Sequence, residues 1–293
     1  MPFSVSKKQR KTKHKKGLRK TTKAVKSGKT VKRHLSLEEV GACHPKVGIK
    51  AKGQCLPLSV KRGLLQNESG CKPDDEHCLI DKSSISEPEK KALRSQYLRP
   101  KYPTEWLQKP DTWLDNIQIA DVMKQYEEAF PWFRFMGALP IDFSAPDPYL
   151  TDKTVKQCMH PEICKLDLRH EHEKGIRGLG FIFNLDPHFK GGSHWVGLYI
   201  DLKDIEHPFV GYSDSYGMKP PALIARLMRF IRLQTPNATL GYNARKFQNS
   251  NTECGMYSMY FIICMIAGIP FQQYVKEVVP DRFMLDLRKV LFT

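Results

Sequence analysis

The feature that most constrains this fold is an apolar segment near the end of the chain, residues 255–268, with the sequence GMYSMYFIICMIAG. It carries no charged residue and is hydrophobic around its whole circumference, which is typical of a helix buried on every face. A membrane span needs about 20 apolar residues, and no apolar run in the chain reaches that length. We therefore expect a buried central helix, in a chain of 293 residues that can hold one large domain or two ordinary ones.

Hydrophobic periodicity predicts further elements on both sides of this helix. Segments typical of strands are 179–185, 195–201, 208–212 and 239–247. Helical periodicity is found in 112–130, 220–233, 271–278 and 281–292, with Thr112 as a candidate N-cap of the first and Pro131 at its end. This order predicts an α+β fold in which a central mixed sheet is packed between helices.

Almost all the excess positive charge lies in one N-terminal segment. The net charge is +16, yet the first 34 residues hold 14 of the 47 Lys and Arg and no acid, which leaves 33 basic against 31 acidic residues, a net +2, in 35–293. Such a Lys-rich segment cannot bury apolar surface, so we expect it to be disordered. We expect it to contact nucleic acid, because counterion release favours such contacts. The alternative is a solvating arm without a specific partner.

Residues 35–105 are less informative and are interpreted as a helical extension. Ser36 and Glu39 form a capping-box pattern. Residues 87–97 have helical periodicity, whereas 72–87 is polar and is expected to be a loop. The predicted division of the chain is a disordered basic tail (1–34), a helical extension (35–105) and the main domain (106–293).

The eight cysteines have the pattern of neither a disulfide-rich scaffold nor a zinc site. The N-terminal segment is basic but lacks the apolar stretch of a secretory signal, so we expect reduced thiols in a cytosolic setting. The residues that invite a zinc interpretation lack a paired C-x2-C spacing; they are Cys43, His44, Cys71, His77, Cys78, Cys158, His160 and Cys164. Residues 170–173 are interpreted as a charged loop. We expect neither a metal nor an organic cofactor.

Two residues beside apolar elements point to nucleophilic catalysis. Cys254 directly precedes the buried helix, where the positive end of the helix dipole favours a thiolate. Gly255 follows it and is expected to leave space for a substrate. His194 begins the apolar strand segment HWVGLYID and is the natural base for a thiol. A buried cysteine is more often a structural residue, as Cys264 in the same helix is expected to be.

A carboxylate that accepts the second imidazole N–H would complete such a site, because it fixes the tautomer of the histidine. Asp214, at the end of the next strand, is one candidate. Asp201 and Asp204 are nearer to His194 in sequence. The residues alone leave these three acids open.

The order of these motifs resembles that of the ubiquitin-like-protein (SUMO) protease family, which also includes the adenovirus protease. The resemblance rests on His194-Trp195, Asp214, Gln248 and the segment 252–255, TECG, with Gln248 six residues before Cys254. Residues 113–116, WLDN, resemble the Trp-Leu motif that opens the first helix of the family's catalytic domain.

The resemblance extends to one viral branch of this family, the core-polyprotein proteases of large nucleocytoplasmic DNA viruses such as African swine fever virus. It is carried by residues 191–201, 212–217 and 249–257, and more loosely by 75–143. Asp214 stands where that branch can have Asn. Glu253 stands where cellular members usually have Asp before the catalytic cysteine.

The resemblance implies a papain-like or adenain-like cysteine peptidase core and a role for each motif. Cys254, His194 and Asp214 would form the triad, with Gln248 in the oxyanion hole. Trp195 and Trp113 would bind substrate by forming a narrow channel that passes only glycines. For Trp113 the alternative is a core anchor on an amphipathic helix.

The function implied is that of a viral cysteine endopeptidase that cleaves structural (core) polyprotein precursors after Gly-Gly during virion maturation. The implied location is the virion and the viral factory of the host cytoplasm. Two alternatives remain open. One is an isopeptidase that removes ubiquitin-like modifiers from host proteins, and the other is a catalytically silent nucleic-acid-binding virion protein.

Overall fold

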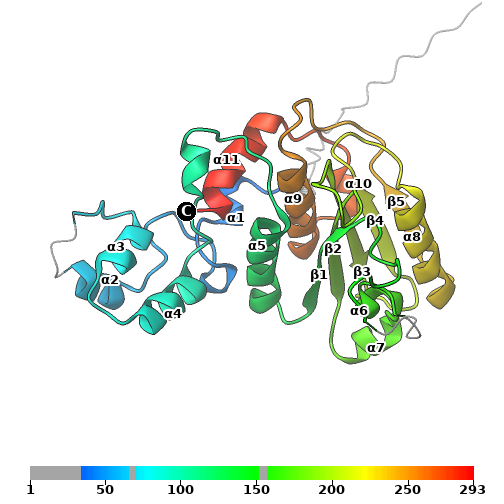
Figure 1. Ribbon diagram of the computed structural model, residues 1–293, viewed down its shortest axis with the longest axis horizontal. Coiled ribbons are helices and arrows are strands. Elements are labelled where there is room, and N and C mark those ends of the chain that lie inside the picture. Colours follow the sequence, from blue (N-terminus) through cyan, green and yellow to red (C-terminus); the bar gives the residue numbers. More distant parts are fainter. Residues whose placement is uncertain (1–33, 66–69, 152–156) are drawn as a thin grey trace, which may run out of the picture. The chain divides into compact units, whose positions relative to one another are not determined.

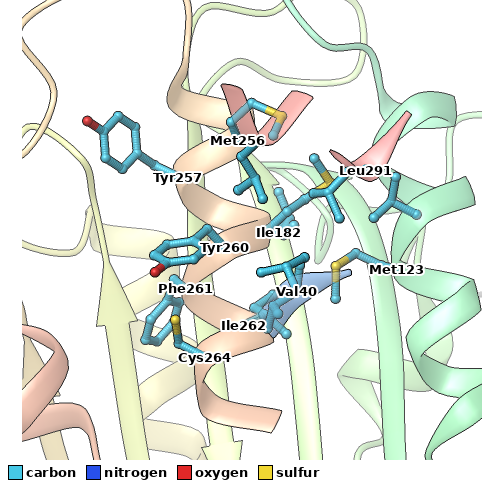
Figure 2. Packing of buried hydrophobic residues seen from close by; sticks show 14 of the residues in the cluster. Val40, Met123, Ile182, Met256, Tyr257, Tyr260, Phe261, Ile262, Cys264 and Leu291 are labelled. Atoms are coloured by element: carbon cyan, nitrogen blue, oxygen red, sulfur yellow. The ribbon is translucent and has the colours of Figure 1, made fainter. Parts of the chain in front are cut away.

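The structure is a computed structural model, and it describes residues 34–65, 70–151 and 157–293. The centre of the fold is helix α9 (Cys254–Ile266), in which every residue is buried, as the apolar segment predicts. It packs against strands β2 (Gly178–Asn184) and β3 (Trp195–Asp201). Figure 2 shows apolar side chains of α9 packed among residues of other elements, including Met123 and Leu291.

A five-stranded mixed sheet supports this helix. Its strand order follows the sequence, from β1 (Phe133–Pro140) through β2, β3 and β4 (Phe209–Ser213) to β5 (Thr239–Tyr242). The two outer pairs, β1–β2 and β4–β5, are parallel, whereas β2–β3 and β3–β4 are antiparallel. The mixed sheet predicted from the sequence is confirmed, although β1 was not predicted.

Helices cover both faces of the sheet (Figure 1). On one face α5 (Asn116–Ala129), α9 and α11 (Asp281–Leu291) share one apolar core, which α10 (Phe271–Tyr274) also joins. On the other face α8 (Ala222–Gln234) buries residues such as Ile224 against Leu198 and Ile200, and α6 (Pro161–Cys164) and α7 (Leu168–Glu173) complete this second core. The chain is therefore an α+β protein, as the sequence predicts.

The segment before the sheet is helical, as expected. It contains α1 (Leu37–Val40), η1 (Pro45–Val47), α2 (Leu58–Leu65), α3 (Glu76–Lys82), α4 (Glu87–Tyr97) and η2 (Thr104–Leu107). The capping box of Ser36 and Glu39 and the predicted helix 87–97 are present. Arg99 joins this segment to α5, because its guanidinium donates a hydrogen bond to the Tyr126 hydroxyl (3.1 Å). The proposed boundary at residue 105 stays a prediction.

Three local predictions were wrong, two because tertiary contacts stabilise helices where the local sequence is polar and one because of a local helix cap. The expected loop 72–87 contains α3, whose buried face includes Leu79 and Ile80. The charged segment 170–173 belongs to α7, anchored by buried Leu168. Helix α5 begins at Asn116 rather than after Thr112, because Asp115 and Gln118 form its capping box.

The expectation of reduced thiols was also wrong for six of the eight cysteines. They form the disulfides Cys43–Cys55, Cys71–Cys78 and Cys158–Cys164. The fold brings the Cα atoms of these pairs to 5.2, 5.8 and 6.7 Å, within the range that a disulfide spans. Each cysteine that invited a zinc interpretation is thus bonded to another cysteine.

Two further findings concern the described ranges alone. Their helices are all too short or too polar to cross a membrane. Their side chains contain no group of three or more metal-ligating residues. The expected disorder of the basic tail falls outside the described residues, apart from His34.

Candidate active site

Three elements converge where β3 begins, β4 ends and α9 begins. Because β3 and β4 are antiparallel, with Gly197 opposite Ser213, His194 just before β3 lies beside Asp214 just after β4. Helix α9 packs on β3 and places Cys254, its first residue, next to the same histidine. The topology therefore brings together three residues that are far apart in the sequence.

Asp214 is the acid that reaches the histidine. Its Oδ1 accepts a hydrogen bond from Nε2 of His194 at 2.8 Å, and the Asp214 side chain is 2% exposed. Asp201 instead accepts from the backbone N–H of Lys203, and Asp204 pairs with His207. Neither of these two alternative carboxylates is hydrogen-bonded to His194.

Other groups hold this carboxylate in position. Buried Asn243 accepts from the Asp214 N–H (2.8 Å) and donates to the Asp214 carbonyl (2.6 Å), which pins its backbone on both sides. The backbone N–H of Tyr216 donates to the same Oδ1 (2.8 Å), and the Tyr216 ring stacks on His194 with centroids 4.8 Å apart. The acid and the imidazole are therefore both fixed in orientation.

The electrostatics of the site favour a protonated histidine. Burial acts to lower the pKa of His194, but it is outweighed by the hydrogen bond to Asp214 and by the hydrogen bond and charge of Cys254, which together raise the pKa to about 9. An imidazolium at neutral pH is the partner that a thiolate requires. The arrangement can therefore hold a thiolate–imidazolium pair.

Gln248 is bonded to Ser215, the residue that directly follows Asp214. The Ser215 hydroxyl donates to Oε1 of Gln248 at 2.6 Å, and the Ser215 carbonyl accepts from the backbone N–H of Gln248 at 2.9 Å. Gln248 is fully buried, and its Nε2 has no hydrogen-bond partner within the described ranges. Buried polar groups are normally hydrogen-bonded, so this unpaired amide donor is an exception that needs an explanation.

The two candidate channel tryptophans line one groove of about 670 Å³, which extends from Trp195 toward the ends of β1 and β2. The Trp195 indole donates to the carbonyl oxygen of Leu114 (2.9 Å), so the strand after His194 is tied to the segment before α5. Trp113 is 46% exposed, so the alternative of a core anchor is wrong.

Gly255 has a different role from the one expected. A Cβ at this position would lie 2.9 Å from Cδ1 of Leu114 and 3.4 Å from Cδ1 of Trp195. The space that Gly255 leaves is thus filled by these two residues rather than left open for a substrate. The missing side chain lets the groove wall pack against the first turn of α9.

Glu253, which precedes the nucleophile candidate, is anchored by the C-terminal helix. Its Oε2 accepts from Nε of Arg288 at 2.8 Å, and both side chains are almost completely buried. The Arg288 guanidinium also lies 4.6 Å from the centre of the Trp106 ring. This ion pair connects α11 to the start of α9.

The class of protein follows from this fold and from a family match. Residues 181–291, which include His194, Asp214 and Cys254, match the C-terminal catalytic domain of the Ulp1 protease family. That family consists of cysteine proteases, and a cysteine at the start of a helix beside a histidine is the arrangement such enzymes require.

Several proteins similar to most of this chain come from large DNA viruses. A protein of Acanthamoeba polyphaga mimivirus assigned to the thiol proteases is 29% identical, over 74% of this chain and 68% of its own. A cysteine protease of African swine fever virus is 22% identical, over 83% and 93%. The crystal structure of the African swine fever virus protease shares the fold, with a TM-score of 0.64 at 18% identity over 87% of this chain and 97% of that one. Residues 181–291 thus match a cysteine protease domain of the Ulp1 type, and the chain as a whole is similar to viral cysteine proteases.

Several residues that build the site were not predicted from the sequence. Ser215, Tyr216 and Asn243 orient the predicted residues, and Arg288 anchors the residue before Cys254. Ser215 and Tyr216 follow Asp214 directly, so the polar run after the strand could have indicated them. Nothing local distinguishes Asn243 or Arg288, because both act across the fold.

Proposed function

We propose that this protease is an endopeptidase that cleaves structural (core) polyprotein precursors after Gly-Gly, in the virion and in the viral factory of the host cytoplasm. The observation that carries the proposal is the groove lined by Trp113 and by Trp195, the residue that directly follows His194. It supports a substrate that enters as an extended, narrow chain.

In the proposed mechanism Cys254, His194 and Asp214 form a triad. Because Nε2 of His194 donates to Asp214, Nδ1 is the nitrogen that takes the proton of the Cys254 thiol. The thiolate attacks the scissile carbonyl carbon and a tetrahedral oxyanion forms. His194 then returns the proton to the leaving amine, and water hydrolyses the thioester with His194 as base.

The oxyanion is bound by two N–H donors. One is Nε2 of Gln248, which is buried and open within the described ranges. The other is the backbone N–H of Cys254, which lies in the first turn of α9, where amides have no acceptor within the helix. Preorganised donors of this kind stabilise the charge that develops in the transition state. No step of the scheme needs a metal or a cofactor.

The groove gives a steric reason for glycine. Trp195 is held by its bond to Leu114, and Leu114 contacts the helix at Gly255, so this wall stands directly beside the nucleophile. If Trp113 closes the other side over the substrate, a β-carbon in the two residues before the cut meets an indole. Glycine has none, and it also adopts the extended backbone that a narrow channel demands.

The test is cleavage of matched peptides that contain Gly-Gly-Xaa, Ala-Gly-Xaa or Gly-Ala-Xaa. We expect each Gly→Ala change to lower kcat/KM at least about tenfold, a difference of about 1.4 kcal/mol in transition-state binding. Trp195→Ala should lower kcat/KM, and it should also reduce the differences in kcat/KM among the three peptides. Equal wild-type rates on all three peptides would contradict the glycine channel.

Variants of the two cysteines in α9 test the nucleophile independently of specificity. Cys254→Ala should abolish cleavage and leave the fold intact, whereas Cys264→Ser, in the same helix, should remain active. Cleavage by Cys254→Ala would refute the mechanism. Release of a ubiquitin-like modifier together with failure to cut viral precursors would favour an isopeptidase.

A further inference from the structure

We propose that Ser215 is a positioning residue that fixes the side-chain amide of Gln248 with its N–H toward the oxyanion. The inference rests on the proposed function, because it assigns the oxyanion to Gln248. Ser215 is 3% exposed and follows Asp214 directly. One short segment thus orients the histidine through Asp214 and the oxyanion donor through Ser215.

The hydrogen bonds around Gln248 are unequal at its two ends. Oε1 accepts from the Ser215 hydroxyl at 2.6 Å, whereas Nε2 has no partner within the described ranges. A buried N–H without a partner is costly to the fold. Here the oxygen end of the amide is held by Ser215, and the N–H end is left unpaired. This orientation presents a hydrogen-bond donor, which is what an oxyanion requires.

The amide could in principle be reversed, because its oxygen and nitrogen ends have nearly the same shape. Reversal would bring Nε2 to the Ser215 oxygen, which can also accept a hydrogen bond. It would nevertheless leave Oε1 buried without a donor and the Ser215 proton without its acceptor. It would also direct a carbonyl dipole at the negative charge of the tetrahedral intermediate. The Ser215 hydroxyl therefore stabilises the one orientation that can catalyse the reaction.

The side chain and the backbone of Ser215 act separately, which makes the hydroxyl testable. The Ser215 carbonyl accepts from the backbone N–H groups of Phe247 (2.7 Å) and Gln248 (2.9 Å), and these bonds are available to any residue at position 215. In Ser215→Ala the main chain around Gln248 should stay in place. The amide alone loses its partner and becomes free to rotate.

The experiment is a double-mutant cycle on a fluorogenic Gly-Gly amide substrate. Removal of an oxyanion donor typically costs about 10²–10³ in kcat, and we expect Gln248→Ala to fall in this range. Ser215→Ala should lower kcat roughly tenfold with little change in KM, a smaller loss because the donor is misoriented rather than absent. In the Gln248→Ala background, Ser215→Ala should have almost no further effect.

Two controls separate this role from general damage. Ser258→Ala removes a hydroxyl that is equally buried and bonds to the Cys254 carbonyl, and it should change kcat less than about twofold. Alkylation of Cys254 by iodoacetamide forms no oxyanion, so its rate should be the same in Ser215→Ala as in wild type. A slower alkylation would show that Ser215 acts on the cysteine–histidine pair and would overturn the inference.

The outcomes distinguish the failure of each claim. A Ser215→Ala loss that persists in the Gln248→Ala background, or no loss at all, overturns the role of Ser215 alone. Full activity of Gln248→Ala removes the glutamine from the proposed mechanism and the inference with it. If the wild-type enzyme cuts no Gly-Gly substrate, the proposed function fails first.

Discussion

At the scale of single residues, the chemistry depends on how His194 keeps its proton. Its pKa is raised to about 9 although burial acts in the opposite direction. The folded pKa is above the ordinary value of about 6.5, so the interactions stabilise the fold fully below pH about 6.5, and this stabilisation is lost as the pH rises through about 9. The imidazolium is therefore the dominant form across the physiological range.

The pH dependence of activity tests this arrangement. We expect the alkaline limb of the kcat/KM profile to lie near pH 9, since His194 loses its proton there. Asp214→Asn removes a hydrogen bond that raises the pKa, so the limb should move to lower pH and kcat/KM should fall. Asp201→Asn, at the far end of β3, is the matched control. It should change neither the position of the alkaline limb nor the value of kcat/KM. An alkaline limb that stays in place in Asp214→Asn would remove Asp214 from the triad.

At the scale of elements, the start of α9 is held by the C-terminal helix α11. Glu253 and Arg288 form a buried ion pair, and burial raises the pKa of Glu253 although Arg288 acts to lower it. Buried charges are tolerated when they are paired, and they are costly when one partner is removed. The pair therefore makes the position of Cys254 depend on α11.

Arg288→Met should destabilise the protein by about 3–5 kcal/mol, because it leaves the Glu253 carboxylate buried without its cation. The loss should shrink as the pH falls, since Glu253 can then become neutral. The measurement is the free energy of unfolding in a denaturant titration.

A second arginine on the same helix gives the control. Arg282 pairs with Asp286 on the surface of α11 and is 77% exposed. Arg282→Met should therefore cost less than about 1 kcal/mol. Equal losses in the two variants would show that the buried pair has no special part in stability.

At the scale of the whole molecule, almost all the excess positive charge lies in the N-terminal segment, and the remainder of the chain is nearly neutral. The net charge is +14 in residues 1–34 and +2 in the remainder. His34 already contacts the folded part, because its ring lies 5.1 Å from that of Tyr274 and its Nε2 is 3.1 Å from the carbonyl oxygen of Glu277. A deletion that tests the tail should therefore stop at residue 33.

Deletion of residues 1–33 should leave turnover of a short peptide nearly unchanged. It should greatly weaken binding to DNA or RNA and flatten the dependence of that binding on salt, because each lost phosphate contact removes about 0.9 from the salt slope on duplex DNA. A full-length variant with the tail Lys and Arg changed to Gln separates charge from length and should behave like the deletion. Unchanged nucleic-acid affinity in both would place the binding surface elsewhere.

Sequence patterns were sufficient to predict the elements that are formed by a continuous apolar segment. The continuous apolar run predicts α9, and the apolar segment after His194 predicts β3. They failed where packing overrides local preference. Gly137 and Pro140 interrupt the pattern of β1, and the polar segment 72–87 hides α3. The pairing of cysteines likewise depends on distances that exist only in the folded chain.

For the site, the sequence by itself pointed to Cys254 as the proposed nucleophile and to His194 as the proposed base, since each stands at the end of a recognisable apolar element. The residues alone left three acids open, and the tertiary structure decided which carboxylate contacts His194. Asp201 is seven residues from His194, but an extended strand rises about 3.3 Å per residue, so β3 carries it to the opposite end of the sheet. Asp214 is 20 residues away, and the antiparallel return of β4 brings it to 2.8 Å from the imidazole, because strand pairing sets which ends meet.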